Sequence, residues 1–261
     1  MNCLQVENLQ VTLQKKEILK NITVSFQKEK RTVILGPNGC GKSTFLRTAA
    51  GLQKNYRGSI LLDGQDISAL PPKKLAQKIA VLTQGASVPT DLTVRELVTY
   101  GRFPYRSWFR QNEKEDRQAI DWAIEQTELE AMQDRLVITM SGGERQRAWI
   151  AMALAQQPEI LLLDEPTTYL DIAHQLEVMQ IIERLHKEMG ITIIMVLHDI
   201  NHALQYADAL VVMKEGSIAA TGKPGDILTP ELLASVFKVR AERFVNDKGD
   251  MILMPWALQK K

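Results

Sequence analysis

The chain contains 261 residues, of which 45% are apolar, and its 32 basic and 31 acidic side chains leave a formal net charge of +1. This balance gives no general positive surface for nucleic acid or an anionic membrane, and the length allows one large core or two modest ones. The longest apolar runs, residues 160–163 and 191–197, are too short to cross a bilayer, so work at a membrane would require a partner.

The sequence contains two cysteines, Cys3 and Cys40. Cys40 lies inside a glycine-rich segment that a disulfide would distort, so we expect a reducing, cytoplasmic compartment. The first ten residues have no basic region followed by an apolar core, so we expect no secretory signal.

The first part of the chain is rich in β-formers. Residues 4–13, 22–26 and 32–35 alternate or cluster apolar side chains between polar turns, which predicts an antiparallel sheet leading into a glycine-rich turn. Further strands are expected at residues 59–62, before the Asp63-Gly64 turn, and at 79–82, ending at Thr83-Gln84. A short helix is expected from Pro71-Pro72 through Leu75.

The glycine-rich segment joins an apolar strand to a helical pattern. Its members are Gly36, Pro37, Asn38, Gly39, Cys40, Gly41, Lys42, Ser43 and Thr44. Glycines let backbone N–H groups curl around an anion, and the helix N-terminus adds its positive dipole end. Lys42 supplies a charge for the β- and γ-phosphates, and Ser43 offers a hydroxyl to Mg²⁺. An ordinary glycine turn is the alternative, but Gly-Lys-Ser at this offset favours a nucleoside triphosphate site.

From residue 86 to residue 158 the pattern becomes helical, as in an insert between two strands of the core. Residues 93–96 form a capping-box sequence, and a charged helix is expected over 113–126. Aromatic and arginine side chains are interleaved over residues 102–110, a composition that could suit single-stranded nucleic acid. The acidic side chains of Glu113, Glu115 and Asp116 follow at once and cancel the positive field, which favours local packing or protein docking.

Ser141, Gly142, Gly143 and Glu144 precede a helical pattern that runs through Gln156. Taken alone, this segment is an ordinary glycine turn and helix cap.

Two carboxylates follow the apolar strand at residues 160–163. Asp164 and Glu165 emerge at its C-terminal end, where ligands bind in open α/β sheets. Asp164 can reach Mg²⁺, directly or through water, and Glu165 can accept a proton from an attacking water. A solvated acidic strand end is the alternative, and the phosphate loop upstream favours the catalytic interpretation.

The next helix is expected to begin after Asp171 and to end at Gly190. Its predicted apolar face, with methionines read as core, consists of Ile172, Leu176, Met179, Ile182, Leu185 and Met189. The strand at residues 191–197 ends at His198, whose position at a strand terminus favours a functional role over a structural one. The other histidines, His174, His186 and His202, are expected to be surface or packing residues.

A hairpin is expected over residues 209–220, with its turn at residues 214–216. Beyond it, helical signals at 230–237 and an apolar segment at 251–256 show no catalytic pattern.

The ordered set of motifs resembles the ATP-binding cassette (ABC) proteins over nearly the whole chain. Residues 36–44 match a Walker A loop, Gln84 matches a Q-loop glutamine, and residues 140–147 match the ABC signature. Residues 161–165 match a Walker B strand with its glutamate, Leu170-Asp171 matches a D-loop, and His198 matches the switch histidine. Within that superfamily, residues 93–102, 164–175 and 196–199 look like ATPases of iron–siderophore, haem and cobalamin importers, most of all the ferric siderophore type.

This resemblance implies an α/β cassette made of a P-loop core with an antiparallel β subdomain (residues 1–85 and 159–220), a helical signature subdomain (86–158) and a C-terminal extension (221–261). It implies ATP and Mg²⁺ as ligands, with Ser43, Gln84 and Asp164 near the metal and Gln84 sensing it. Glu165 would polarise the water, and His198 would contact the γ-phosphate. In a head-to-tail homodimer, Ser141, Gly142, Gly143 and Glu144 would face the nucleotide of the opposite subunit.

The implied partners are a membrane permease that holds the cassette at the cytoplasmic face and, indirectly, an extracytoplasmic substrate-binding protein; nucleic acid is not expected. The alternative is a soluble cassette ATPase in translation, repair or assembly, which one cassette and the absence of paired Cys-x-x-Cys sequences disfavour. Two positions depart from the family pattern. Leu13 stands where an aromatic side chain usually stacks on adenine, and Met140 replaces a commoner leucine.

Overall fold

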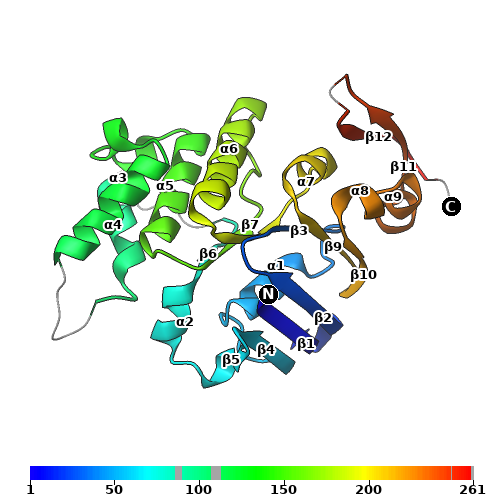
Figure 1. Cartoon of the computed structure of the whole chain (residues 1–261), viewed down its shortest axis with the longest axis horizontal. Coiled ribbons are helices and arrows are strands. Elements are labelled where there is room, and N and C mark those ends of the chain that lie inside the picture. The colour runs from blue at the N-terminus through cyan, green and yellow to red at the C-terminus, as the bar shows by residue number, and fades with distance from the viewer. Residues whose placement is uncertain (86–89, 107–112, 248, 260–261) are drawn as a thin grey trace. The chain divides into compact units, whose positions relative to one another are not determined.

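A computed structural model describes residues 1–85, 90–106, 113–247 and 249–259. The chain divides into two compact units. Unit 1 comprises Met1–Ser68 and Ile194–Lys261, and unit 2 comprises Ala69–Ile193. Figure 1 labels most of the helices and strands of both units. The boundary between the units falls inside strand β8 (Thr192–Val196).

Unit 1 contains an antiparallel sheet of four strands in the order β2-β1-β4-β5. The strands are β1 (Asn2–Leu13), β2 (Lys16–Gln27), β4 (Arg57–Leu62) and β5 (Gln65–Asp66). In β1 the buried side chains are Cys3, Leu4, Val6, Leu9 and Val11, and a register shift after Val6 moves the alternating inward face by one residue. Asn8, at this shift, has a positive φ of 51°.

The phosphate-loop strand also belongs to unit 1. Strand β3 (Arg31–Leu35) pairs in parallel with β9 (Ala209–Lys214), which pairs antiparallel with β10 (Ser217–Gly222). The helices of this unit are α1 (Lys42–Ala49), α7 (Ile200–Tyr206), α8 (Pro224–Ile227) and α9 (Pro230–Phe237). The chain ends in a hairpin of β11 (Val239–Val245) and β12 (Met251–Leu258).

Unit 2 combines two parallel strands with helices. Strands β6 (Ile79–Leu82) and β7 (Ile160–Asp164) pair in parallel, and every residue of β7 is buried, as a continuous apolar run requires. The helices are α2 (Pro72–Lys78), α3 (Val94–Thr99), α4 (Glu113–Gln126), α5 (Gly142–Ala155) and α6 (Ile172–Met189). The predicted class, α/β with mixed strand pairing, an antiparallel β part and a helical part, is confirmed.

One predicted surface is wrong in part. On α6 the side chains of Ile172 and Leu176 are 78% and 38% exposed, whereas Met179, Ile182 and Leu185 are buried. The spacing identified one face of the helix correctly, but only its later turns pack against the protein, together with Val178 and Ile181.

The interleaved aromatic and arginine segment is structural where it is described. Arg102 is buried, and its guanidinium donates to Asp116 Oδ1 at 2.7 Å and to the Ala155 carbonyl at 2.8 Å, joining the segment to α4 and α5. The same guanidinium lies 3.9 Å from the ring centroid of Tyr105. Local packing therefore accounts for this part of the segment, and residues 107–110 lie outside the described residues.

Candidate functional site: a phosphate loop and a carboxylate cluster

The phosphate loop lies between β3 and α1 in unit 1. Gly39 and Gly41 have φ angles of +75° and +105°, a region that side chains rarely adopt. A Cβ on Gly36 would lie 2.3 Å from the Met213 carbonyl oxygen, and one on Gly41 would lie 2.7 Å from Leu19 Cδ2. The loop can therefore approach its neighbours this closely only with glycine at these positions.

Helix α1 begins at the end of this loop. Its N-cap is Gly41, which provides no side-chain hydrogen bond to the first N–H groups. Ser43 and Thr44 are half-buried in its first turn. An N-terminus without a side-chain cap leaves donors that suit an anion, as a phosphate site requires.

Lys42 and Cys40 lie within the loop. The Lys42 ammonium group is buried and donates to the carbonyl oxygens of Gly36 at 2.8 Å and Pro37 at 3.2 Å, so the loop's own backbone holds the cation in place. Asn38 and Gly39 are exposed at the tip. The Cys40 thiol is buried, and burial raises its pKa while the Lys42 charge opposes the increase. Cys40 is therefore a packing residue in its protonated form.

His198 follows the strand next to β3 in unit 1. The Leu197 N–H donates to the Ile34 carbonyl at 3.3 Å, and His198 is the next residue and is exposed. Asp199 then caps α7 by accepting from the His202 N–H at 2.9 Å. These bonds fix the backbone on both sides of His198.

The carboxylate cluster lies in unit 2, where β6 and β7 end side by side. Their parallel register pairs Leu82 with Leu163, so the residues that follow each strand emerge together. The Gln84 amide donates to Glu165 Oε2 at 2.5 Å, and the Thr168 hydroxyl donates to the same oxygen at 3.1 Å. This part of the predicted site is thus brought together by direct hydrogen bonds.

Asp164 and Glu165 differ in environment although they are adjacent. Asp164 is buried at the last position of β7, whereas Glu165 is half-buried and has a φ of +55°. A left-handed backbone is uncommon for a residue with a side chain and turns the chain sharply after the strand. The backbone therefore changes direction between the two adjacent acidic residues, and both line one cavity in unit 2.

The signature segment forms a complete capping box. Glu144 N–H donates to Ser141 Oγ at 3.2 Å, and Ser141 N–H donates to Glu144 Oε2 at 2.7 Å. This second bond is the main reason why the pKa of Glu144 is below its ordinary value. The start of α5 is therefore set by local chemistry.

Gly143 lies against α6. A Cβ at Gly143 would lie 2.1 Å from His174 Cδ2, and the His174 ring is held by Asp171 Oδ1 at 2.8 Å from its Nδ1. Asp171 also accepts from the His174 N–H at 2.9 Å, which lowers the pKa of the Asp171 carboxyl. Asp171 thus caps α6 and orients the histidine that faces Gly143.

A cavity of about 270 Å³ joins several of these segments within unit 2. Its lining includes Gln84, Asp164, Glu165 and Gly142. It also includes Arg145, Gln146 and Thr168, which lie inside the matched motif stretches but were given no role of their own, and Trp149, which lies outside those stretches. Those on α5 follow Gly142 at spacings of three, four and seven, which places them on one face of the helix. That periodicity could have identified them.

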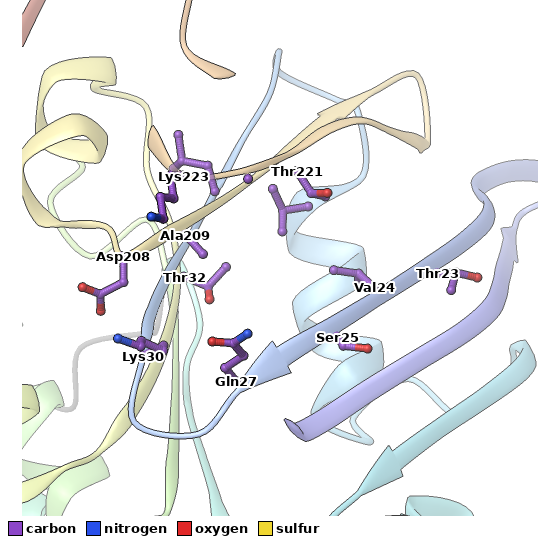
Figure 2. A pocket seen from close by; sticks show the side chains of 13 residues that line it. Thr23, Val24, Ser25, Gln27, Lys30, Thr32, Asp208, Ala209, Thr221 and Lys223 are labelled. Carbon is purple, nitrogen blue, oxygen red and sulfur yellow. The ribbon is translucent and has the colours of Figure 1, made fainter. Parts of the chain in front are cut away.

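A second cavity, of about 430 Å³, lies in unit 1 beside the N-terminal end of β3. Figure 2 shows Lys30, Asp208 and Lys223 at one end of it and Thr23 toward the other. Asp208 accepts from the Arg31 backbone N–H at 2.8 Å and from its guanidinium at 3.2 Å, so this carboxylate joins the starts of β3 and β9. The predicted site residues do not line this cavity.

Oxygen atoms suited to Mg²⁺ occur among the candidate residues. Ser43 offers a hydroxyl, Gln84 an amide oxygen and Asp164 a carboxylate, the donor types that Mg²⁺ prefers. Within the described residues, no group of three or more His, Cys, Asp and Glu side chains could hold a metal ion, and no helix is long and apolar enough to cross a membrane.

The sequence profile of the ABC transporter family matches residues 19–168, more than half of the chain. The chain belongs to the ABC transporter family. This cassette is therefore an ATPase that serves a transporter, as the motifs predicted. It is 45% identical over 242 residues to the iron(3+)-hydroxamate import ATP-binding protein FhuC of Bacillus subtilis, covering 93% of this chain and 90% of that protein.

A second relative is the ferric enterobactin transport ATP-binding protein FepC of Escherichia coli, 44% identical over 237 residues and covering 91% of this chain and 88% of that protein. Among solved structures, one described as an inward-facing metal-chelate type ABC transporter matches 99% of this cassette and 98% of that chain, with a TM-score of 0.84 and 26% identity. A dimeric cassette bound to ADP and phosphate after hydrolysis matches 85% of this cassette and 98% of that chain, with a TM-score of 0.73 and 28% identity.

Proposed function

We propose that this cassette is the ATP-hydrolysing subunit of an importer for a ferric siderophore. The support is that two relatives of nearly equal identity, 45% and 44%, are both named for iron-chelate import. One is named for a hydroxamate and the other for enterobactin, so similarity favours the class of cargo and not one compound. These relatives favour import over the alternative of a soluble cassette in translation, repair or assembly.

The observation that carries the proposed mechanism is the hydrogen-bonded Gln84–Glu165 pair. Two donors, the Gln84 amide and the Thr168 hydroxyl, converge on one oxygen of Glu165 and hold the carboxylate in one orientation. Glu165 then acts as the general base that accepts a proton from the attacking water. Mg²⁺ supplies charge neutralisation for the phosphates when bound, with Ser43, Asp164 and Gln84 as its candidate ligands.

The phosphate loop supplies binding rather than chemistry. The N–H groups of the loop and of the first turn of α1 surround the β- and γ-phosphates, and Lys42 exchanges its two carbonyl contacts for phosphate oxygens. His198 is the candidate contact to the γ-phosphate from the strand beside β3. The half-buried Leu13 replaces the usual aromatic residue, so adenine would gain apolar contact without ring stacking.

A second copy of the cassette completes the site in this proposal. Ser141, Gly142, Gly143 and Glu144 lie at the start of α5, and a dimeric cassette is among the structural relatives. The N-terminus of α5 is directed at the γ-phosphate of the opposite subunit, where its dipole favours the negative charge. Closure on ATP and reopening after hydrolysis move the partner subunits.

The partners that follow are a membrane permease and, through it, an extracytoplasmic substrate-binding protein. The cassette itself lies at the cytoplasmic face and is held there by the permease. Nucleic acid is not among the proposed partners.

Reconstitution with the cognate permease and binding protein in liposomes tests this function. ATP hydrolysis and uptake of radioactive iron are measured with a ferric hydroxamate, a ferric catecholate, haem and cobalamin in parallel. We expect one ferric siderophore to stimulate both activities, and Glu165→Gln to abolish both while retaining ATP binding. Stimulation by haem or cobalamin alone would reassign the cargo, and no stimulation by any of the four would refute the proposal.

A further inference from the structure

The C-terminal hairpin is attached to helix α7 of unit 1 at Leu253 of β12. Figure 1 shows β11 and β12 following α9 at the end of the chain. Leu253 of β12 is fully buried, and its N–H and C=O make reciprocal bonds of 3.0 and 3.1 Å with the Asn201 side chain on α7. The strand therefore has a defined inner face, and its alternate residues point the other way.

The outer face of the hairpin carries several exposed apolar side chains. Ile252, Met254 and Trp256 of β12 are 38%, 55% and 54% exposed, and Phe244 of β11, which pairs with Ile252, is 45% exposed. Four large apolar side chains on one face of a two-stranded sheet form a contiguous exposed patch. Such patches on soluble proteins commonly mark interaction sites.

Two opposite charges share this face. The pairing places Glu242 directly opposite Met254, so both side chains project outward. The Arg240 guanidinium lies 5.9 Å from the ring centroid of Trp256, which places it on the same side. We define the hairpin face as these six residues: Arg240, Glu242, Phe244, Ile252, Met254 and Trp256.

We propose that the hairpin face binds the hairpin face of a second copy of this chain. Arg240 and Glu242 are two residues apart on one strand, so a two-fold axis passing between them and across the strands sets each Arg240 against the Glu242 of the other copy. The same axis sets Met254 of one copy against Trp256 of the other. The face is therefore complementary to itself in charge and in apolar content.

This contact goes beyond the proposed function, because it needs neither nucleotide nor cargo. It would keep two cassettes together when their nucleotide sites are open. An anionic membrane fits the face less well, because Glu242 stands in the middle of the apolar patch. Stable interfaces bury about 800 Å² per partner. The six side chains of the hairpin face supply a smaller area, so we expect a reversible dimer with a dissociation constant in the micromolar range.

Sedimentation velocity of the full chain without nucleotide measures this association. Wild type should show a monomer–dimer equilibrium, and Met254→Ser should raise the dimer dissociation constant at least about tenfold. Leu52→Ser is the matched control, since Leu52 is also 55% exposed in unit 1 but lies outside the hairpin. Thermal unfolding of each variant establishes that it is folded.

A charge exchange tests the geometry. Arg240→Glu and Glu242→Arg should each weaken self-association, because like charges then meet across the two-fold axis. Mixing the two variants should restore association as a heterodimer, detected by energy transfer between labelled copies. The proposal is overturned if wild type stays monomeric, if Leu52→Ser has the same effect as Met254→Ser, or if the mixed variants do not associate. Binding of the wild-type chain to anionic vesicles, lost in Met254→Ser without any dimer, would also overturn it.

Discussion

Gly143→Ala adds one methyl group at the point where α5 meets α6. The new Cβ would lie 2.1, 2.6 and 2.9 Å from His174 Cδ2, Cγ and Cβ. Rotation of the His174 side chain moves Cδ2 and Cγ but leaves Cβ in place, so the contact to Cβ remains. The rotation would also break the hydrogen bond between the His174 ring and Asp171. Overpacking of this kind costs about 1–3 kcal/mol, so we expect Gly143→Ala to lower the free energy of unfolding by this amount.

Gly142→Ala is the matched control. A Cβ at Gly142 meets only Leu170 Cδ2, at 3.4 Å, which is an ordinary contact. Replacing a helical glycine by alanine normally stabilises by about 0.5–1 kcal/mol, so Gly142→Ala should leave stability unchanged or raise it. Of these two neighbouring glycines, only Gly143 is thus expected to lose stability when it is replaced by alanine.

A double-mutant cycle with His174→Ala identifies the cause. The double variant removes the two ring contacts and should recover most of the lost stability, giving a coupling of at least about 1 kcal/mol by urea denaturation. Additive effects within about 0.5 kcal/mol would refute the steric argument. If stability recovers and ATP hydrolysis does not, the glycine backbone is required at the phosphate, independently of packing.

Three further predictions concern single side chains. Glu165→Gln should retain nucleotide binding and lower phosphate release at least about 100-fold, since it removes the base; wild-type turnover would exclude Glu165 from that role. Cys40 is buried, and burial raises the pKa of its thiol, so a maleimide should modify it much more slowly in the folded chain than in urea. The modified chain should lose ATP binding. Rapid labelling that leaves ATP binding intact would contradict this prediction. The hydrogen bond from the Ser141 N–H lowers the pKa of Glu144 from its ordinary value of 4.5. The ionised carboxylate of Glu144 therefore stabilises the folded state at a pH above 4.5, and this stabilisation is lost as the pH falls through the lower pKa of the folded state. Glu144→Gln should remove this part of the acid dependence of unfolding, and an unchanged pH profile would count against it.

Local chemistry explains which elements could be predicted from the sequence. The capping box at Thr93 is present because it needs only residues three apart, and Pro230–Phe237 is a helix with proline at its start. The burial of the strand at residues 160–163 could be predicted from its apolar composition alone. Each of these signals is contained in a few consecutive residues.

Features that depend on a distant segment could not be predicted in this way. The exposure of Ile172 depends on what packs beside the first turn of α6, which the helical period does not encode. Strand β11 was not expected, because Glu242 and Arg243 interrupt its apolar pattern and a register shift displaces its pairing with β12. The Thr168 contact to Glu165 arises from a turn that only the left-handed backbone of Glu165 creates.

The helix starts of this chain also separate N-termini that have a side-chain cap from N-termini that lack one. Helices α2 and α8 lack a side-chain cap but have a proline in the first turn, whereas α1 has neither. Side-chain oxygens of Thr93, Asp171 and Asp199 accept N–H groups at the starts of α3, α6 and α7, whereas α1 begins at Gly41 with no such bond. An uncapped start beside a buried Lys42 is the arrangement that an anion completes.

Helix α5 combines the two arrangements. Its capping box satisfies the Glu144 N–H, while the preceding N–H groups belong to Gly142 and Gly143 and are not part of the box. Glycine at both positions keeps side chains away from these donors, and Gly143 in addition must be small because His174 lies against it. In the proposed dimer, a packing requirement and a phosphate-binding requirement would therefore coincide at Gly143, whereas only the second would apply at Gly142. For this reason Gly142→Ala is expected to spare stability whether or not it spares hydrolysis, and comparing the two alanine variants separates the two requirements.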